Sequence, residues 1–426
     1  MTTIKITGGH KLHGEVAIHS AKNAILPMLA ASLLFENDRL IFDNIPNIKD
    51  VNVMIQLLTS IGIRTNFTAN ELIVDIPFNS ELQYETPETL VSQMRATLLI
   101  MGPMLAKKHK VEISLPGGCS IGYRPINLHM DALELMGATI HLDHGILIAE
   151  APNGLHAAEI HLDIPSVGAT ENIIMAAVLT EGVTIIDNAA KEPEIVDLVH
   201  FLNLAGADIR GAGTSIIEIR GVSQLKANPH PYEVIPDRIE AATYMIAVAS
   251  TGGEVVLTNV IAAHLDAIIS KLREIGVVVH VDANQDKITV IAQPPYMVEH
   301  DIDIKTATYP GFATDIQPII FALLLQLNRN TFVADTIFKN RFQHIEEFNK
   351  LGVRTTQLEN TVIIDGENTV SSGKIKATDL RTAASMLLVG ISQPIELEID
   401  NIDMLNRGYQ DLIKNLNKLG ADIEVL

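Results

Sequence analysis

The feature that most constrains the fold is a pattern that occurs six times along the 426 residues. In each copy an apolar, helix-like stretch ends at a glycine, and a strand-like stretch rich in β-branched residues follows. The six glycines lie 68 to 76 residues apart, at Gly62, Gly137, Gly206, Gly276, Gly352 and Gly420. A glycine just past a helix adopts the left-handed conformation that closes the last turn. The spacing therefore predicts six similar units rather than one continuous fold.

Each unit has a second helix-like stretch ahead of this pattern, and it is apolar on nearly every side. A helix that is apolar all round is usually buried. We expect these helices to begin near Lys22, Arg95, Thr170, Glu240, Asp315 and Arg381, with bodies such as residues 24–34, 96–105 and 316–325. Each unit then holds two helices and roughly four strands. Six such units predict an α/β protein of two domains with three units each.

The two ends of the predicted first domain are also visible in the sequence. Two strand-like runs, residues 3–7 and 15–19, lie on either side of Gly8-Gly9 and precede the first helix. They need not belong to the domain that follows them. The segment Ala227-Asn-Pro-His-Pro contains two prolines just before the fourth unit, which favours a hinge at that point.

Net charge narrows the choice of ligand. The chain carries a formal charge of −20, so its surface repels nucleic acid and anionic lipid. Its longest apolar runs, such as residues 24–34 and 318–325, are shorter than the roughly 18 residues of a membrane span. With a single cysteine, the chain forms no internal disulfide, which fits a reducing cytoplasm. Because of the negative net charge, an anionic substrate would need a local cationic pocket.

Charged and polar residues gather where the buried helices are expected to begin. They are Lys22 with Asn23, Arg95, Ser166 to Gly168, Arg238, Asp315 and Arg381. A helix N-terminus already favours anions, so adding a cation there costs about 0.3–1 kcal/mol if exposed. For any one residue a salt bridge at a domain interface is the simpler explanation. The set as a whole favours an anionic ligand in a cleft between the two domains.

Cys119 lies in a segment of three glycines and two prolines, which is typical of a loop. A thiol on a loop near Arg124 can act as an acid, a base or a nucleophile. The alternative is an inert buried thiol. Other motifs are negative: Gly211-Ala-Gly213 lacks the helix of a dinucleotide site, and no histidine pair has a convincing third metal ligand. These motifs give no reason to expect a metal site or a dinucleotide site.

A series of short motifs runs through the whole chain in order. They are Ser20-Ala-Lys-Asn-Ala, Met94-Arg-Ala, Leu115-Pro-Gly-Gly-Cys-Ser-Ile-Gly-Tyr-Arg-Pro, Pro165-Ser-Val-Gly-Ala-Thr, Ile235-Pro-Asp-Arg-Ile-Glu-Ala, Tyr309-Pro-Gly-Phe-Ala-Thr-Asp, Asn340-Arg-Phe, Ala377-Thr-Asp-Leu-Arg and Asn406-Arg-Gly-Tyr. In these motifs the chain resembles the UDP-N-acetylglucosamine 1-carboxyvinyltransferases, which are enolpyruvyl transferases. The sibling 5-enolpyruvylshikimate-3-phosphate synthases share the repeat but lack the Gly-Gly-Cys loop.

The resemblance implies an inside-out α/β barrel in each of two domains, built from three βαβαββ-type repeats around buried helices. The active site lies in the cleft between the domains. It also implies that the N-terminal strands join the C-terminal domain. The expected domains are therefore residues 22–234, and residues 1–21 together with 235–426.

The resemblance also implies the substrates, phosphoenolpyruvate and UDP-N-acetylglucosamine, and the residues that act on them. The catalytic residues are Cys119 as proton donor and fosfomycin target, Asp315 as base, Lys22 and Arg407. The residues that bind phosphoenolpyruvate are Lys22, Asn23, Arg124, Arg381 and Arg407. Those that contact the nucleotide sugar are Arg95, Arg124, Pro125, Ile126, Asn127, Leu128, Ser166, Val167, Gly168, Asp315, Ile337 and Arg341. The resemblance implies a cytoplasmic enzyme of peptidoglycan synthesis that needs no metal and no organic cofactor. We expect a monomer.

The chain departs from the common family pattern at Ser20, Tyr123, Asn127, Ile164, Ala313 and Asn406. None of these positions removes a proposed catalytic group. Two alternatives stay open at this point: the same fold acting on another acceptor, such as shikimate 3-phosphate, and a catalytically silent relative that binds a nucleotide sugar.

Overall fold

The computed structural model describes residues 2–68, 71–114 and 126–426. These residues form two compact units, which we call the N unit (residues 20–68, 71–114 and 126–235) and the C unit (residues 2–19 and 236–426). Each unit has its own hydrophobic core. The domain boundaries expected from the sequence lie one or two residues from these limits.

The described part of the chain forms six small sheets, three in each unit. In the N unit, the first sheet has the strand order β13 (Tyr232–Glu233), β3 (Asp38–Asp43), β5 (Glu71–Ile76), β4 (Arg64–Phe67). The second has the order β6 (Lys110–Ser114), β8 (Ile146–Glu150), β7 (Thr139–Asp143). The third has the order β9 (Glu159–His161), β10 (Val183–Asp187), β12 (Ile216–Arg220), β11 (Asp208–Arg210). In the C unit, the first sheet has the strand order β21 (Gly373–Lys376), β22 (Glu396–Asp400), β1 (Thr3–Thr7), β23 (Asp422–Val425). The second has the order β2 (Leu12–Ala17), β14 (Gly253–Thr258), β16 (Lys287–Ala292), β15 (Val278–Val281). The third has the order β17 (Ile302–Lys305), β18 (Thr331–Ala334), β20 (Thr361–Ile364), β19 (Thr355–Leu358).

One strand order recurs in these sheets, which confirms the repeat. A first strand pairs in parallel with the second, and two antiparallel strands follow, as in β9, β10, β12 and β11. The sheet that begins with β17 has the same pairing. In the sheet of β6 the parallel partner is a single bridge between Glu85 and Glu112. The repeat is therefore a βαβαββ unit, in which a crossover helix joins the two parallel strands.

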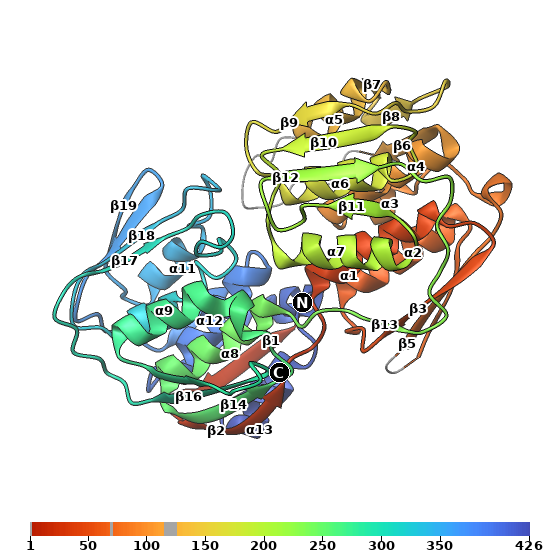
Figure 1. The fold of residues 1–426 in the computed structure, drawn as a ribbon. Helices are drawn as coiled ribbons and strands as arrows, with labels where there is room; N and C mark the ends of the chain where they lie inside the picture. Colours follow the sequence, from red (N-terminus) through yellow and green to blue (C-terminus); the bar gives the residue numbers. More distant parts are fainter. Residues whose placement is uncertain (1, 69–70, 115–125) are drawn as a thin grey trace. The chain divides into compact units, whose positions relative to one another are not determined.

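Segments distant in the sequence complete three of the sheets. Strand β1 lies between β22 and β23, and β2 pairs in parallel with β14. In Figure 1 these N-terminal strands, drawn in red, lie in the same unit as the C-terminal half of the chain. Strand β13 joins β3 in the N unit. Over the described residues, the chain therefore passes from one unit to the other after His19 and after Ile235. The second N-terminal strand covers Leu12–Ala17, not the expected residues 15–19.

The glycine pattern predicted the helix ends correctly. The helices that precede the six glycines are α2 (Lys49–Ile61), α5 (Asn127–Leu135), α7 (Pro193–Leu204), α9 (Asp266–Ile275), α11 (His344–Lys350) and α13 (Leu412–Leu419). All six glycines have positive φ values, between 89° and 117°. An L-residue rarely adopts this conformation, so only glycine closes these turns without strain.

The second helix of each repeat is buried. In the N unit these helices are α1 (Lys22–Ala31) with the 3₁₀ turn η1 (Ser32–Leu34), η3 (Arg95–Ile100) continued by α4 (Met101–Lys108), and α6 (Val167–Ala177). In the C unit they are α8 (Arg238–Thr251), α10 (Phe321–Leu324) and α12 (Leu380–Ser392). Every residue of α12 is buried, and α8, α10 and α12 pack on one another. Each unit is therefore an inside-out barrel, with helices at its centre and sheets around them.

The expected helix starts need correction at three places. Helix α6 begins at Val167 rather than Thr170, and α8 begins at Arg238 rather than Glu240, because their caps, Ser166 and Asp237, lie earlier in the chain. The expected helix over residues 316–325 is wrong for most of its length, since only Phe321–Leu324 is α-helical. Pro318 has no N–H to donate, and tighter turns lie before and across it, with Ile316 N–H donating to Ala313 O and Ile319 N–H donating to Ile316 O.

The remaining short helices connect these elements. They are α3 (Glu88–Val91), η2 (Asn79–Glu81), η4 (Ala262–Leu265) and η5 (Ile402–Arg407). Over residues 2–68, 71–114 and 126–426, no helix is both long enough and apolar enough to cross a membrane.

Candidate active site

Asp315 in the C unit lies between two arginines. Its Oδ1 is 2.6 Å from Nη2 of Arg341, and its Oδ2 is 2.9 Å from Nη2 of Arg381. The side chains of the two arginines are 3% and 5% exposed, whereas the Asp315 side chain is 28% exposed. Two adjacent cations favour the ionised carboxylate. Asp315 is thus an anionic group, open to solvent, whose partners are almost completely buried.

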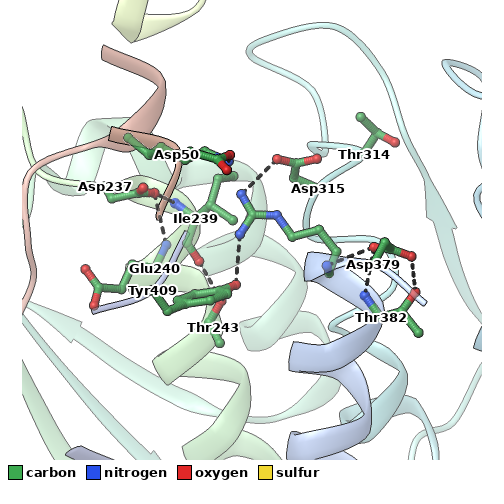
Figure 2. Close-up of polar contacts among 12 residues, drawn as sticks. Asp50, Asp237, Ile239, Glu240, Thr243, Thr314, Asp315, Asp379, Thr382 and Tyr409 are labelled. Carbon is green, nitrogen blue, oxygen red and sulfur yellow. Dashed lines mark hydrogen bonds and ion pairs between the residues drawn. The ribbon is translucent and has the colours of Figure 1, made fainter. Parts of the chain in front are cut away.

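Arg381 is held at both ends of its side chain. It follows Asp379, which caps α12 and accepts the Arg381 N–H at 2.9 Å (Figure 2). Its Nη1 donates to the Tyr409 hydroxyl at 3.0 Å. Burial lowers the pKa of Arg381, but Tyr409, Asp315 and Asp237 raise it by more. The guanidinium therefore stays charged inside the unit, which a buried cation can do only beside a partner.

A loop beside Asp315 is fixed by the buried carboxylate of Asp335. Its Oδ1 accepts the N–H groups of Ile337 at 2.9 Å and Phe338 at 2.8 Å. Its Oδ2 accepts the Thr314 hydroxyl at 2.7 Å. Because Thr314 precedes Asp315 in the chain, Asp335 ties the Ile337 segment to the backbone that presents Asp315. Nε of Arg341 adds a second tie by donating to Thr314 O at 3.2 Å.

In the N unit, Lys22 begins α1 and pairs with an acidic residue of α2. Lys22 Nζ is 3.4 Å from Asp50 Oδ2, and the two side chains are 12% and 4% exposed. Asn23 follows on the first turn of α1, a helix with no acidic residue in that turn. The cation and the positive end of the helix dipole are both suited to an anionic ligand.

A second polar group in the N unit is centred on His129. Asn172 Nδ2 donates to His129 Nδ1 at 2.8 Å and to Leu98 O at 2.9 Å. Asn172 Oδ1 accepts the Gly102 N–H at 2.8 Å. Since Nδ1 accepts a hydrogen bond, neutral His129 carries its proton on Nε2. Burial, and then the charge of Arg95, lower the pKa of His129 to about 4.

His129 also lies against the start of α6. A Cβ added to Gly168 would be 3.1 Å from His129 Cε1. Ser166 caps α6, with its hydroxyl accepting the Ala169 N–H at 3.4 Å. The N unit thus brings the segment from Ser166 to Gly168 together with His129. Arg95 is near enough for its charge to act on the His129 ring.

Comparison with known proteins identifies the family. The family model described as EPSP synthase (3-phosphoshikimate 1-carboxyvinyltransferase) matches residues 6–425. UDP-N-acetylglucosamine 1-carboxyvinyltransferase 1 of Staphylococcus aureus (strain N315) is 43% identical over 424 residues, covering 100% of this chain and 99% of the relative. UDP-N-acetylglucosamine 1-carboxyvinyltransferase 2 of Staphylococcus saprophyticus is 42% identical over the same length and shares.

The chain belongs to the UDP-N-acetylglucosamine 1-carboxyvinyltransferase family.

Solved structures share the fold of this family member. The enolpyruvyl transferase NikO from Streptomyces tendae has a TM-score of 0.88 at 24% identity, covering 100% of this chain and 98% of NikO. EPSP synthase from Acinetobacter baumannii has a TM-score of 0.74 at 19% identity, with 100% of both chains covered. These two likenesses concern the fold alone.

In the present chain, each unit brings together some of the residues expected in the site. In the C unit, Arg341 and Arg381 both contact Asp315. Arg407 ends η5 and is partly exposed, and Ile337 is 37% exposed. In the N unit, Asn127 begins α5 after Ile126, and its amide is 3.4 Å from Asp131; Leu128 follows it. Cys119, Arg124 and Pro125 lie outside the described residues, and so does Tyr123.

Sequence reasoning missed several residues that hold this site. Asp50, Asp335 and Thr243 were not singled out, and Tyr409 appeared only as the end of a motif. Each contacts the site from a distant part of the chain, such as the 166 residues between Thr243 and Tyr409. The one available signal was charge: Asp50 and Asp335 are acidic residues next to apolar stretches. Among the described residues, no group of three His, Cys, Asp or Glu side chains could hold a metal ion.

Proposed function

We propose that this chain transfers the enolpyruvyl group of phosphoenolpyruvate to the 3′-hydroxyl of UDP-N-acetylglucosamine and releases phosphate. The observation that carries the proposal is 43% identity, from end to end, to a relative named for this activity. In a bacterium the reaction is the first committed step of peptidoglycan synthesis. We propose a cytoplasmic monomer that needs no cofactor.

The chemistry is an addition followed by an elimination. The sugar 3′-oxygen forms a bond to C2 of phosphoenolpyruvate while C3 gains a proton, which gives a tetrahedral ketal. The ketal then loses a proton from C3 and the C2–O bond to phosphate, and the enol ether forms. The steps need a base for the hydroxyl proton, an acid at C3, and cations around phosphate and carboxylate.

The C unit supplies the base in this proposal. The carboxylate of Asp315 is held by two arginines and is partly exposed, and in this proposal it accepts the hydroxyl proton. Arg381 lies beside it and also binds the phosphoenolpyruvate anion, together with Arg407. Arg341, Asp315 and Ile337 contact the nucleotide sugar, and Asp335 fixes the loop that carries Ile337.

The N unit supplies the remaining groups. Lys22 and Asn23 bind phosphoenolpyruvate at the start of α1, where the helix end adds to the charge of Lys22. Arg95, the Ile126–Leu128 segment and the Ser166–Gly168 segment contact the nucleotide sugar. From the family resemblance, Cys119 donates the proton to C3, and Arg124 and Pro125 complete the contacts.

Phosphate release tests the proposal. The purified chain is incubated with phosphoenolpyruvate, with and without UDP-N-acetylglucosamine, before and after fosfomycin. We expect release only when both substrates are present, and none after the drug. Cys119→Asp should keep activity, since a carboxyl group also donates protons, and should resist fosfomycin. Continued sensitivity of this variant would contradict the thiol as the target.

Two further measurements separate the alternatives. Release with shikimate 3-phosphate, but not with the nucleotide sugar, would replace the proposed acceptor. Binding of UDP-N-acetylglucosamine with no release under any condition would indicate a silent relative. In that case the positions that depart from the family pattern, Asn127, Ile164 and Asn406, would be the first to revert.

A further inference from the structure

A directed chain of hydrogen bonds leads from Arg381 into the core of the C unit. Arg381 Nη1 lies 3.0 Å from the Tyr409 hydroxyl, which lies 2.9 Å from the Thr243 hydroxyl (Figure 2). The Thr243 hydroxyl donates to Ile239 O, one turn earlier in α8, at 2.7 Å. The three side chains come from α12, from the segment after η5 and from α8, and these elements pack together.

The order of donors in this chain is fixed. Thr243 has one hydroxyl hydrogen and gives it to Ile239 O, so it accepts from Tyr409. Tyr409 then gives its only hydrogen to Thr243 and presents a lone pair to Arg381. A guanidinium only donates, so each hydrogen bond has its correct partner. Tyr409 is 3% exposed and Thr243 is 0% exposed, which leaves little water to replace a lost bond.

The Tyr409 bond decides where the guanidinium points. The Asp379 cap fixes the backbone of Arg381, but the long side chain still has several rotamers. Tyr409 holds Nη1, and its ring centroid lies 5.4 Å from the guanidinium carbon. The other terminal nitrogen, Nη2, is then directed to Asp315 Oδ2 at 2.9 Å.

We infer that Tyr409 is a positioning residue for Arg381, and that Thr243 sets the direction of the Tyr409 hydroxyl. Tyr409 touches no substrate; it holds the guanidinium in the orientation that serves both Asp315 and the anion of phosphoenolpyruvate. The inference rests on the proposed function, because it assigns Arg381 to that anion. Misplacement by about 1 Å of such a group can cost about 100-fold in rate.

Tyr409→Phe tests the inference, with Tyr296→Phe as a matched control. Tyr296 is also a buried tyrosine of the C unit, 7% exposed, and its hydroxyl donates to Ala249 O at 2.8 Å. Both variants lose one buried hydroxyl, so both should lose similar thermal stability. In the phosphate-release assay we expect Tyr409→Phe to raise KM for phosphoenolpyruvate by about tenfold, the scale of one hydrogen bond to a charged group. KM for UDP-N-acetylglucosamine should stay within about twofold, and Tyr296→Phe should change neither constant.

A double variant shows whether the effect passes through Arg381. In an Arg381→Lys background, Tyr409→Phe should add little to KM for phosphoenolpyruvate, because lysine has no guanidinium group for Tyr409 to orient. Equal phosphoenolpyruvate KM values for Tyr409→Phe and Tyr296→Phe would overturn the inference, and so would additive effects in the double variant. Absence of turnover in the unaltered chain would refute the proposed function instead, so the two failures are distinguishable.

Discussion

Removing the carboxylate of Asp315 should both stop the reaction and destabilise the C unit. In Asp315→Ala, Arg341 and Arg381, whose side chains are 3% and 5% exposed, lose their shared anion. Breaking a fully buried pair in this way costs about 3–5 kcal/mol. Asp315 is 28% exposed, and each arginine keeps one oxygen acceptor, Thr314 O or the Tyr409 hydroxyl. We therefore expect the free energy of unfolding to fall by about 2–3 kcal/mol.

The stability loss can be measured against an exposed pair in the same unit. Asp365 Oδ2 lies 3.7 Å from Arg354 Nε, and these side chains are 45% and 64% exposed. Asp365→Ala should cost about 0–1 kcal/mol. By thermal unfolding, Asp315→Ala should melt about 4–12 °C below the unaltered chain, at about 2–4 °C per kcal/mol for a domain of this size. Its phosphate release should fall by about 100- to 10,000-fold, the range for a lost general base.

Two results would refute this reasoning. Equal melting temperatures for Asp315→Ala and Asp365→Ala would show that the arginines do not depend on Asp315. Normal turnover by Asp315→Ala would remove it from the base role. Since stability and turnover are measured separately, either idea can fail alone.

Two further predictions concern the N unit. Burial lowers the pKa of His129 from 6.5 to about 4. As pH drops, His129 therefore takes up a proton in the unfolded chain before it does so in the folded chain. The free energy of unfolding should fall by about 3 kcal/mol from this residue between about pH 6.5 and pH 4. His129→Gln should flatten the acid limb of melting temperature against pH, and an unchanged limb would exclude His129 as its source. In Gly102→Ala the new Cβ would be 2.2 Å from Asn172 O, so α4 and α6 must separate and the protein should lose about 1–3 kcal/mol or more. Gly145→Ala meets no atom within 4 Å but has a φ of 84°, so it should show only the cost of backbone strain in chemical denaturation; equal losses would contradict the close contact of the helices.

Local chemistry explains why much of the fold could be predicted. A glycine past a helix is needed whatever the surrounding fold, so Gly62 and its five counterparts marked the helix ends correctly. Apolar residues on all sides of a helix likewise indicate burial without knowledge of the partners, as for α12. The exception at residues 316–325 is also local, because hydrophobicity concealed the missing N–H of Pro318.

The contacts that shape the candidate site are not local. Asp335 binds the Thr314 hydroxyl 21 residues away, and Tyr409 meets Thr243 across 166 residues. No periodicity in one segment carries such a pairing. The family resemblance pointed to Asp315 and its arginines because their motifs are short and specific. The residues that hold them in place became visible only through hydrogen bonds in the folded chain.

The placement of β1 and β2 has a consequence for the order of folding. These strands are made first, yet β1 pairs with residues 396–400 and 422–425, and β2 pairs with residues 253–258. The N unit is nearly continuous in sequence and can condense during synthesis, whereas the C unit waits for the last strand. Pairings of such long range are slow to form. During that wait the two N-terminal strands have unpaired edges, which makes this early segment the part of the nascent chain most dependent on protection from aggregation.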